Sequence, residues 1–192
     1  MRKFFIESKK ETTPEAVFVK TLYLLCPKEK YDIVCLDGKD NLPKAAGVMI
    51  ANSEEGGENL IIFDADSERN GGGYEKRRKQ IEEQLQKMGV EASLFLFPNN
   101  HDDGDFETLL EHIARKDKHK AFFDCFSDYE KCLGNDYHHP NQKAKMFAYI
   151  NGMKSLSGMK RRNLGIGEWL FDNPEYWDLD SDYLIPLKQF LK

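Results

Sequence analysis

The sequence has few cysteines, no long hydrophobic run and no excess of positive charge, and each absence excludes a class of protein. No apolar run approaches the roughly 20 residues that span a bilayer, and the first residues lack the apolar stretch of a signal peptide. The formal net charge of -5 argues against a surface that coats nucleic acid through general basicity. We therefore expect a cytoplasmic protein with no membrane partner, on which local basic patches are still allowed.

The 4 cysteines are spaced too widely for the tight Cys-x-x-Cys pairs of structural zinc sites. Cys26 and Cys35 lie in apolar runs, which predicts that they pack in the core. Cys125 and Cys132 precede the histidine pair 138–139, but their spacing does not match a zinc knuckle. Structural or incidental roles are therefore predicted for all of them.

Short apolar runs alternate with amphipathic segments over the first half of the chain. The apolar runs predict strands, and the segments between them predict helices. The predicted strands cover residues 3–7, 31–36, 60–64 and 92–97, and the predicted helices cover residues 14–25, 42–51 and 74–88. Such alternation predicts an α/β fold of three layers, Rossmann-like, with a mostly parallel sheet between helices.

The second half is predicted to be helical, over residues 105–115, 121–133, 141–156 and 183–191. We expect residues 1–117 to form the α/β domain and residues 118–192 to form a helical C-terminal extension packed on the same domain. Tyr176 and Trp177 lie in an acidic stretch near the end of the chain. They are predicted to close the core, and the alternative is that they dock a protein partner.

Three acidic residues follow two of the predicted strands. Glu7 ends the run Phe4-Phe5-Ile6, and Asp64 and Asp66 follow the run 60–63. Ligands of parallel α/β sheets bind beyond the carboxyl ends of the strands. If the two strands are neighbours, their carboxylates converge there, and a hard divalent cation such as Mg²⁺ or Mn²⁺ would neutralise them. The ordinary alternative is that each acid caps a turn or a helix.

Further candidates are charged residues at helix starts and in basic clusters. Asp105 and Glu107 fit a helix N-cap and first turn, although Glu107 fits a metal site equally well. The glycine loop 71–73 opens onto a basic helix start, which can cradle a phosphate or simply be a solvated helix face. The candidate nucleic-acid contacts are Lys76, Arg77, Lys160 and Arg161, and Lys143 and Lys145 are candidate electrostatic helpers.

The segments Phe5-Ile6-Glu7 and Ile61-Ile62-Phe63-Asp64-Ala65-Asp66 resemble the toprim domain, the Mg²⁺-binding module of topoisomerases, primases and overcoming-lysogenization-defect nucleases. The runs Phe97-Pro98-Asn99-Asn100 and Gly104-Asp105-Phe106-Glu107-Thr108-Leu109-Leu110 resemble a group of small, stand-alone toprim-like proteins. The resemblance covers roughly residues 3–115. It departs from many toprim domains at Ser8, where they have glycine.

The resemblance implies a toprim fold in which Glu7, Asp64 and Asp66 form the acidic triad and bind Mg²⁺ or Mn²⁺. It also slightly favours a role for Glu107 in the metal site over a role at the helix start. The implied function is metal-dependent hydrolysis of phosphodiester bonds in nucleic acid, either DNA or RNA. Glu7 would then ligate the metal or act as a base.

Two other classes of function fit parts of this pattern. A non-catalytic toprim-like module would bind metal or nucleic acid and serve a partner protein. A haloacid-dehalogenase-like phosphatase would use Asp64 as nucleophile and Asp66 as acid or base, but it would leave Glu7 without a role.

Overall fold

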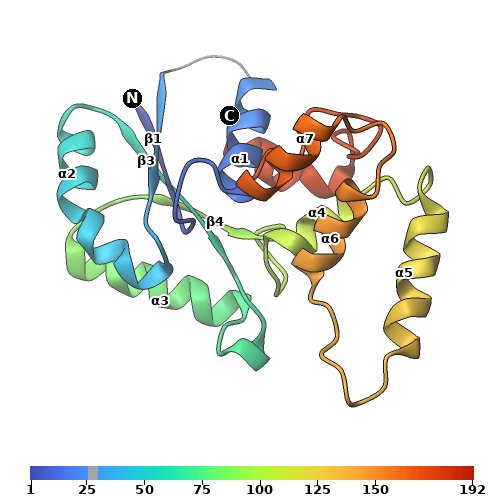
Figure 1. The fold of residues 1–192 in the computed structure, drawn as a ribbon. Coiled ribbons are helices and arrows are strands. Elements are labelled where there is room, and N and C mark those ends of the chain that lie inside the picture. Colours follow the sequence, from blue (N-terminus) through green and yellow to red (C-terminus); the bar gives the residue numbers. More distant parts are fainter. Residues whose placement is uncertain (26–29) are drawn as a thin grey trace.

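The computed structural model describes residues 1–25 and 30–192, so Cys26 lies outside the described residues. Within them the chain forms a four-stranded sheet in the order β2-β1-β3-β4, in which all pairs are parallel (Figure 1). The strands are β1 (Arg2–Ile6), β2 (Tyr31–Cys35), β3 (Glu58–Asp64) and β4 (Ser93–Phe97). The strands β1 and β3, which carry the predicted acidic residues, are therefore the two central strands.

Side chains of the central strands alternate between two hydrophobic clusters, one on each face of the sheet. Phe4 and Ile6 belong to one cluster, whereas Phe5, between them in sequence, belongs to the other. In β3, Ile62 faces the first cluster and Ile61 the second. This period-2 alternation with both faces buried is what makes the strands continuous apolar runs in the sequence.

Helices cover both faces, which gives three layers (Figure 1). One face packs against α1 (Pro14–Leu25), α4 (Phe106–Ile113), α6 (Gln142–Asn151) and α8 (Ile185–Phe190). The other packs against the 3-10 helix η1 (Lys39–Ala45), α2 (Ala46–Glu54) and α3 (Tyr74–Met88). The predicted Rossmann-like α/β class with a parallel sheet is confirmed.

The C-terminal helices contribute side chains to the same core cluster as β1, β3 and β4. Tyr176 and Trp177 are 4% and 0% exposed, so the prediction that they close the core is confirmed. The Trp177 indole N–H donates to the main-chain oxygen of Trp169 at 3.1 Å. By contrast, α5 (Lys120–Cys132) has no fully buried residue and stands away from the sheet in Figure 1. In the described part of the chain, no helix has the length and apolar character needed to cross a membrane.

The predicted helices differ from the structure at three places. The helix predicted for residues 141–156 ends at Asn151, and a separate α7 (Gly158–Asn163) follows, with the Ser157 hydroxyl as its N-cap. The helix predicted from residue 42 begins as η1, which contains Pro43, and turns α-helical at Ala46. Short 3-10 turns also occur at Glu68–Asn70 (η2), Leu164–Ile166 (η3) and Asp182–Leu184 (η4). Such turns lack a hydrophobic period in the sequence.

Glu111 connects α4 to α6 through two contacts. Its Oε1 accepts a hydrogen bond from Lys145 Nζ at 2.8 Å, and its Oε2 accepts one from Gln142 Nε2. Partial burial alone would raise the pKa of Glu111, but Lys145 and Gln142 outweigh that effect and lower it to about 2. The carboxylate of Glu111 therefore stabilises the contact between these helices.

We expect Glu111→Gln to lower the free energy of unfolding at pH 7 by about 1 kcal/mol, a value reduced for the partial exposure of the pair. Because the folded pKa lies below the unfolded one, this stabilisation is present above about pH 4.5 and is lost as the pH falls towards 2. Urea unfolding between pH 2.5 and 7 measures the difference. Glu55→Gln, at an exposed helix end, is the control. A difference that does not shrink with falling pH would contradict the assignment.

Candidate functional site

Glu7 and Asp64 meet at the carboxyl edge of the sheet because β1 and β3 are parallel neighbours. Ile6 pairs with Ile62, so both acidic residues leave the sheet at adjacent points. The Asp64 main-chain N–H points at Glu7 Oε2, at 3.4 Å. Asp64 Oδ1 accepts a hydrogen bond from the main-chain N–H of Phe106 at 2.9 Å, which connects it to the start of α4. The Glu7 carboxylate therefore lies against the backbone of Asp64, and the two acidic residues are neighbours at this edge.

The pKa values of both groups are raised. Burial raises the pKa of Asp64 well above its usual value, and the nearby carboxylates of Glu7, Glu107 and Asp105 raise it further. For Glu7, burial raises the pKa most, the Asp64 N–H opposes the shift, and the Asp66 carboxylate adds to it. Negative charge is therefore costly at this edge of the sheet, as expected for carboxylates that a cation would neutralise.

Asp66 lies on the same edge but has cationic partners of its own. Its φ of 60° is in the left-handed region, which aspartate tolerates better than most residues. Its Oδ2 lies 2.5 Å from Arg77 Nη2 and 3.8 Å from Lys39 Nζ. A Cβ at Gly72 would lie 2.4 Å from the Asp66 Cβ, so only glycine allows this close approach. The loop after β3 thus turns Asp66 towards α3, away from the arrangement expected for three converging carboxylates.

Glu107 extends the acidic edge on the side of α4. It is 7% exposed, and burial raises its pKa. Lys143 Nζ, on α6, lies 3.2 Å from Glu107 Oε1 and 3.6 Å from Glu15 Oε1. Glu107 Oε1 and Glu15 Oε2 are nevertheless buried and have no hydrogen-bond partner among the described residues. Within the residues that the structure describes, Glu15 Oε2 is thus an unpaired carboxylate oxygen, whereas Glu107 Oε1 is already ion-paired with the Lys143 ammonium.

Glu15 and Lys143 therefore belong to this site, although little in their sequence context indicates it. Glu15 follows Pro14 in the first turn of α1, where an acidic residue is ordinary. Lys143 is distant in sequence and was a candidate helper only through its charge. The packing of α6 beside α4 brings it to Glu107.

The donor set at this edge fits a hard divalent cation, because carboxylate oxygens are the preferred ligands of Mg²⁺ and Mn²⁺. The arrangement of these carboxylates, however, does not form a complete metal site. Across residues 1–25 and 30–192, no three His, Cys, Asp or Glu side chains are close enough to hold an ion among them. Glu7, Glu107 and Asp105 each lie near enough to Asp64 to raise its pKa without forming such a group. Residues that would hold the ion are thus present, but each is engaged with other protein groups.

The acidic residues of the segment after β4 are engaged in contacts close to them in the fold. Asp105 caps α4 by accepting from the Thr108 N–H at 2.8 Å, which confirms the predicted cap. Asp103 Oδ1 accepts from the Tyr74 N–H at 2.7 Å, at the start of α3. Asp102 contacts Asn99 and His101 within its own loop. The N-terminus of α3, a candidate phosphate cradle, is therefore already bound by a carboxylate.

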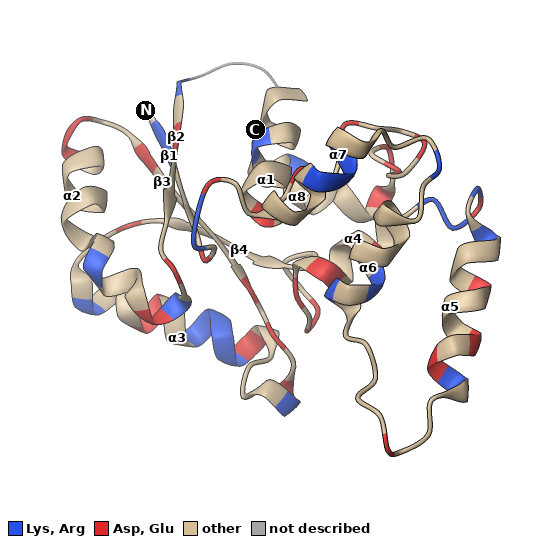
Figure 2. Ribbon diagram, viewed as in Figure 1, with Lys and Arg blue, Asp and Glu red and all other residues tan. Residues whose placement is uncertain are grey.

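The predicted nucleic-acid contacts lie in different surroundings. Arg77 is 4% exposed and paired with Asp66, whereas Lys76 is exposed on the same helix. Lys160 and Arg161 lie on α7, which Figure 2 shows on the opposite side of the sheet from α3. The structure therefore does not gather these four residues into one basic surface.

The cysteines and histidines outside the acidic edge form no metal site in the described part of the chain. Cys35 is half-buried against the core, while Cys125 and Cys132 are exposed on α5.

Comparison with protein-family models gives no match, and comparisons with curated proteins and with solved structures give none either. The resemblance to toprim domains therefore depends on the sequence segments quoted above, and its functional content is a proposal.

Proposed function

We propose that this protein hydrolyses phosphodiester bonds of nucleic acid with the help of Mg²⁺ or Mn²⁺ at the edge formed by Glu7 and Asp64. The observation that carries the proposal is that Glu7 and Asp64 are neighbours at the carboxyl ends of the two central parallel strands, where the Glu7 carboxylate accepts from the Asp64 main-chain N–H. Ligand sites of α/β sheets lie at this edge. The buried Glu107 carboxylate, which lies close enough to raise the pKa of Asp64, supports the same location.

Asp64 would be the central ligand, since Glu7 and Glu107 both lie close enough to raise its pKa. Asp66 would join the site if its carboxylate left the Arg77 guanidinium and bound the ion instead. When bound, the cation would supply charge neutralisation for the scissile phosphate and activation of water. Glu7 would ligate the ion or accept a proton from the attacking water.

Lys143 adds a fixed positive charge to the same edge. Its ammonium lies between Glu107 and Glu15, and the attraction of these carboxylates outweighs burial and raises its pKa. It therefore stays protonated at neutral pH and is suited to attract a phosphate rather than to transfer a proton.

Cleavage of labelled single- and double-stranded DNA and RNA, with Mg²⁺, Mn²⁺ or EDTA, tests the proposal. We expect metal-dependent cleavage that Glu7→Gln and Asp64→Asn each reduce by on the order of 100-fold or more, as for loss of a catalytic acid–base group. Glu91→Gln, at the opposite edge of the sheet, should leave the rate unchanged.

Three other outcomes distinguish the alternatives. Cleavage that survives both site variants would reject this site. Metal binding without turnover of any substrate would favour the non-catalytic module that serves a partner protein. Phosphate release from small phosphate esters through a covalent aspartyl-phosphate would favour the phosphatase.

A further inference from the structure

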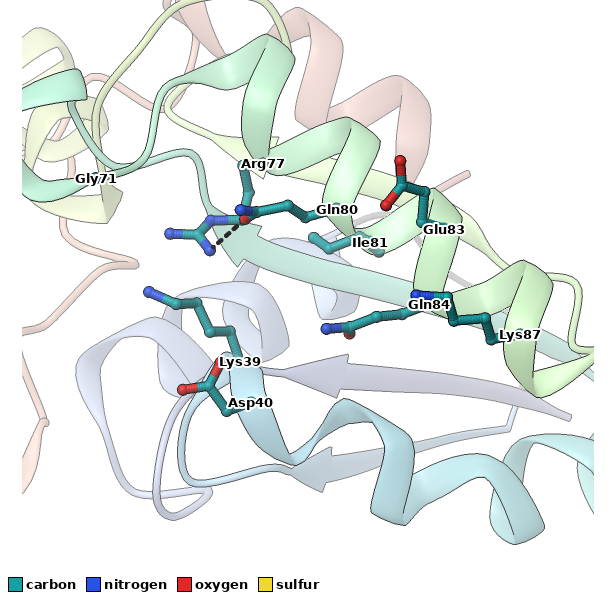
Figure 3. Close-up of a pocket in the computed structure, with 9 residues that line it drawn as sticks. All are labelled: Lys39, Asp40, Gly71, Arg77, Gln80, Ile81, Glu83, Gln84 and Lys87. Atoms are coloured by element: carbon teal, nitrogen blue, oxygen red, sulfur yellow. Dashed lines mark hydrogen bonds between the residues drawn. The ribbon is translucent and has the colours of Figure 1, made fainter.

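A polar cavity lies next to the acidic edge, between η1 and α3 (Figure 3). Its volume is about 310 Å³, at the small end of ligand pockets, which commonly measure about 300–1,000 Å³. It therefore suits a small group rather than a large cofactor. Its polar lining comes from Lys39 and Asp40 of η1 and from Arg77, Gln80, Gln84 and Lys87 of α3.

The charged residues that line this cavity are three cations, Lys39, Arg77 and Lys87, and two acids, Asp40 and Glu83. Figure 3 shows Lys39 extending towards the Arg77 guanidinium, and Gln84 and Lys87 lying beside each other along α3. The Glu83 carboxylate points away from the cavity in the same view. The interior therefore offers ammonium, guanidinium and amide donors, which together suit an anion with several acceptor oxygens.

Arg77 shows that the cavity is built into the fold. The residue is 4% exposed, its Nη1 donates to Gln80 Oε1 at 3.1 Å, and its Nη2 binds Asp66. Its buried Nε has no hydrogen-bond partner among the residues that the structure describes. An unpaired buried donor on a cation is costly and rare, so the fold holds this guanidinium at the cavity wall at some cost in stability.

Asp66 connects the cavity to the acidic edge. Arg77 and Lys39 both contact its Oδ2, so an anion in the cavity would lie one side chain away from the carboxylates of the proposed metal site. Asp66 alone balances only one of these two cations. The lining as a whole carries three positive charges, from Lys39, Arg77 and Lys87, against the two negative charges of Asp40 and Glu83.

We propose that this cavity binds the phosphate of a phosphomonoester. If the proposed nuclease function holds, on which this extension rests, the group bound is the terminal phosphate of the nucleic acid. The protein would then act near phosphorylated ends, because the bound end and the acidic edge share Asp66. A free nucleotide carries the same chemistry and is the other source of such a phosphate.

Binding measured without divalent cations tests the cavity separately from catalysis. The probes are inorganic phosphate, adenosine with and without its 5′-phosphate, and a single-stranded oligonucleotide with and without a 5′- or 3′-phosphate, each titrated by calorimetry. Among the probes that bind, we expect the phosphorylated member of each pair to bind at least about tenfold more tightly than the unphosphorylated member. A factor of this size is the effect of one charge-assisted contact. The oligonucleotide and nucleotide arms distinguish the two sources.

Lys39→Met and Lys87→Met should each weaken this binding by about tenfold, whereas Lys79→Met, on the exposed part of α3, should leave it unchanged. Both test residues reach into solvent, so the fold should survive, and circular dichroism checks this. Asp64→Asn should retain phosphate binding while losing cleavage, so failure of the nuclease proposal leaves this result intact. Equal affinity for phosphorylated and unphosphorylated probes, absence of binding, or equal weakening by Lys79→Met would overturn the proposal.

Discussion

In buffer without divalent cations at pH 8, Asp64→Asn is expected to unfold at a higher temperature than the wild type. The folded protein holds Asp64 next to Glu7 and Glu107, and burial together with these neighbours raises its pKa well above the usual value. Asparagine removes the charge but keeps an oxygen that can accept the Phe106 N–H. A substitution at a site shaped for function therefore stabilises the metal-free fold.

The pH dependence of this difference has a definite sign. A carboxyl group whose folded pKa exceeds its unfolded pKa binds more protons in the folded state. Wild-type stability should therefore fall as the pH rises from the unfolded value of about 4 through the raised folded value. Asp64→Asn lacks this titrating carboxyl group. The stabilities of the two proteins should therefore become equal below about pH 4 and differ above it.

Magnesium should reverse the order of stability of the two proteins, so that the wild type becomes the more stable one. A ligand that binds only the folded state at 100 times its Kd adds about 2.7 kcal/mol to the free energy of unfolding. The wild type should gain this stabilisation and Asp64→Asn should not. Differential scanning fluorimetry at pH 4 and pH 8, with EDTA or Mg²⁺, measures both effects, and Glu91→Gln is the control. Equal stabilisation of both proteins by Mg²⁺, with no gain for the variant in EDTA, would contradict the metal site.

The sheet was predictable because its determinants are local in sequence. Runs such as Phe4-Phe5-Ile6 bury alternate side chains on opposite faces, and only a strand covered on both sides does this. Asp105 was predictable as a cap for the same reason, since its partner Thr108 is three residues away. α7 was not, because a single six-residue helix with no buried residue has no hydrophobic period.

The candidate site was predictable only in part. Glu7 and Asp64 follow apolar runs, and the general rule for parallel sheets brings strand ends together. The pairing of Asp66 with Arg77 depends on a left-handed turn and on Gly72 fitting against it, neither of which a charge pattern shows. The contact of Lys143 with Glu107 depends on the packing of α6 against α4, which is a tertiary property. Residues were thus predicted well where a strand positions them and poorly where a loop or a distant helix does.

Phe106→Ala is expected to cause the largest loss of stability and to weaken the site at the same time. The Phe106 side chain is 0% exposed, and its ring centroid lies 5.2 Å from that of Phe97 and 5.3 Å from that of Phe18. Truncating a buried phenylalanine commonly costs about 3–5 kcal/mol, because transfer energy is lost and a cavity remains. Urea unfolding monitored by circular dichroism measures this loss.

The same residue couples the core to the acidic edge, because its main-chain N–H binds Asp64 Oδ1. The cavity left by alanine lets the start of α4 shift, so Mg²⁺ should stabilise Phe106→Ala less than it stabilises the wild type. Phe106→Leu, which retains most of the apolar volume, should cost less stability and keep more of the Mg²⁺ response. Tyr137→Ala, at a residue 65% exposed, should change stability by no more than about 0.5 kcal/mol. If Phe106→Ala lost stability but kept the full response to Mg²⁺, the N–H of this residue would not position Asp64 for the ion, and α4 would serve the core alone.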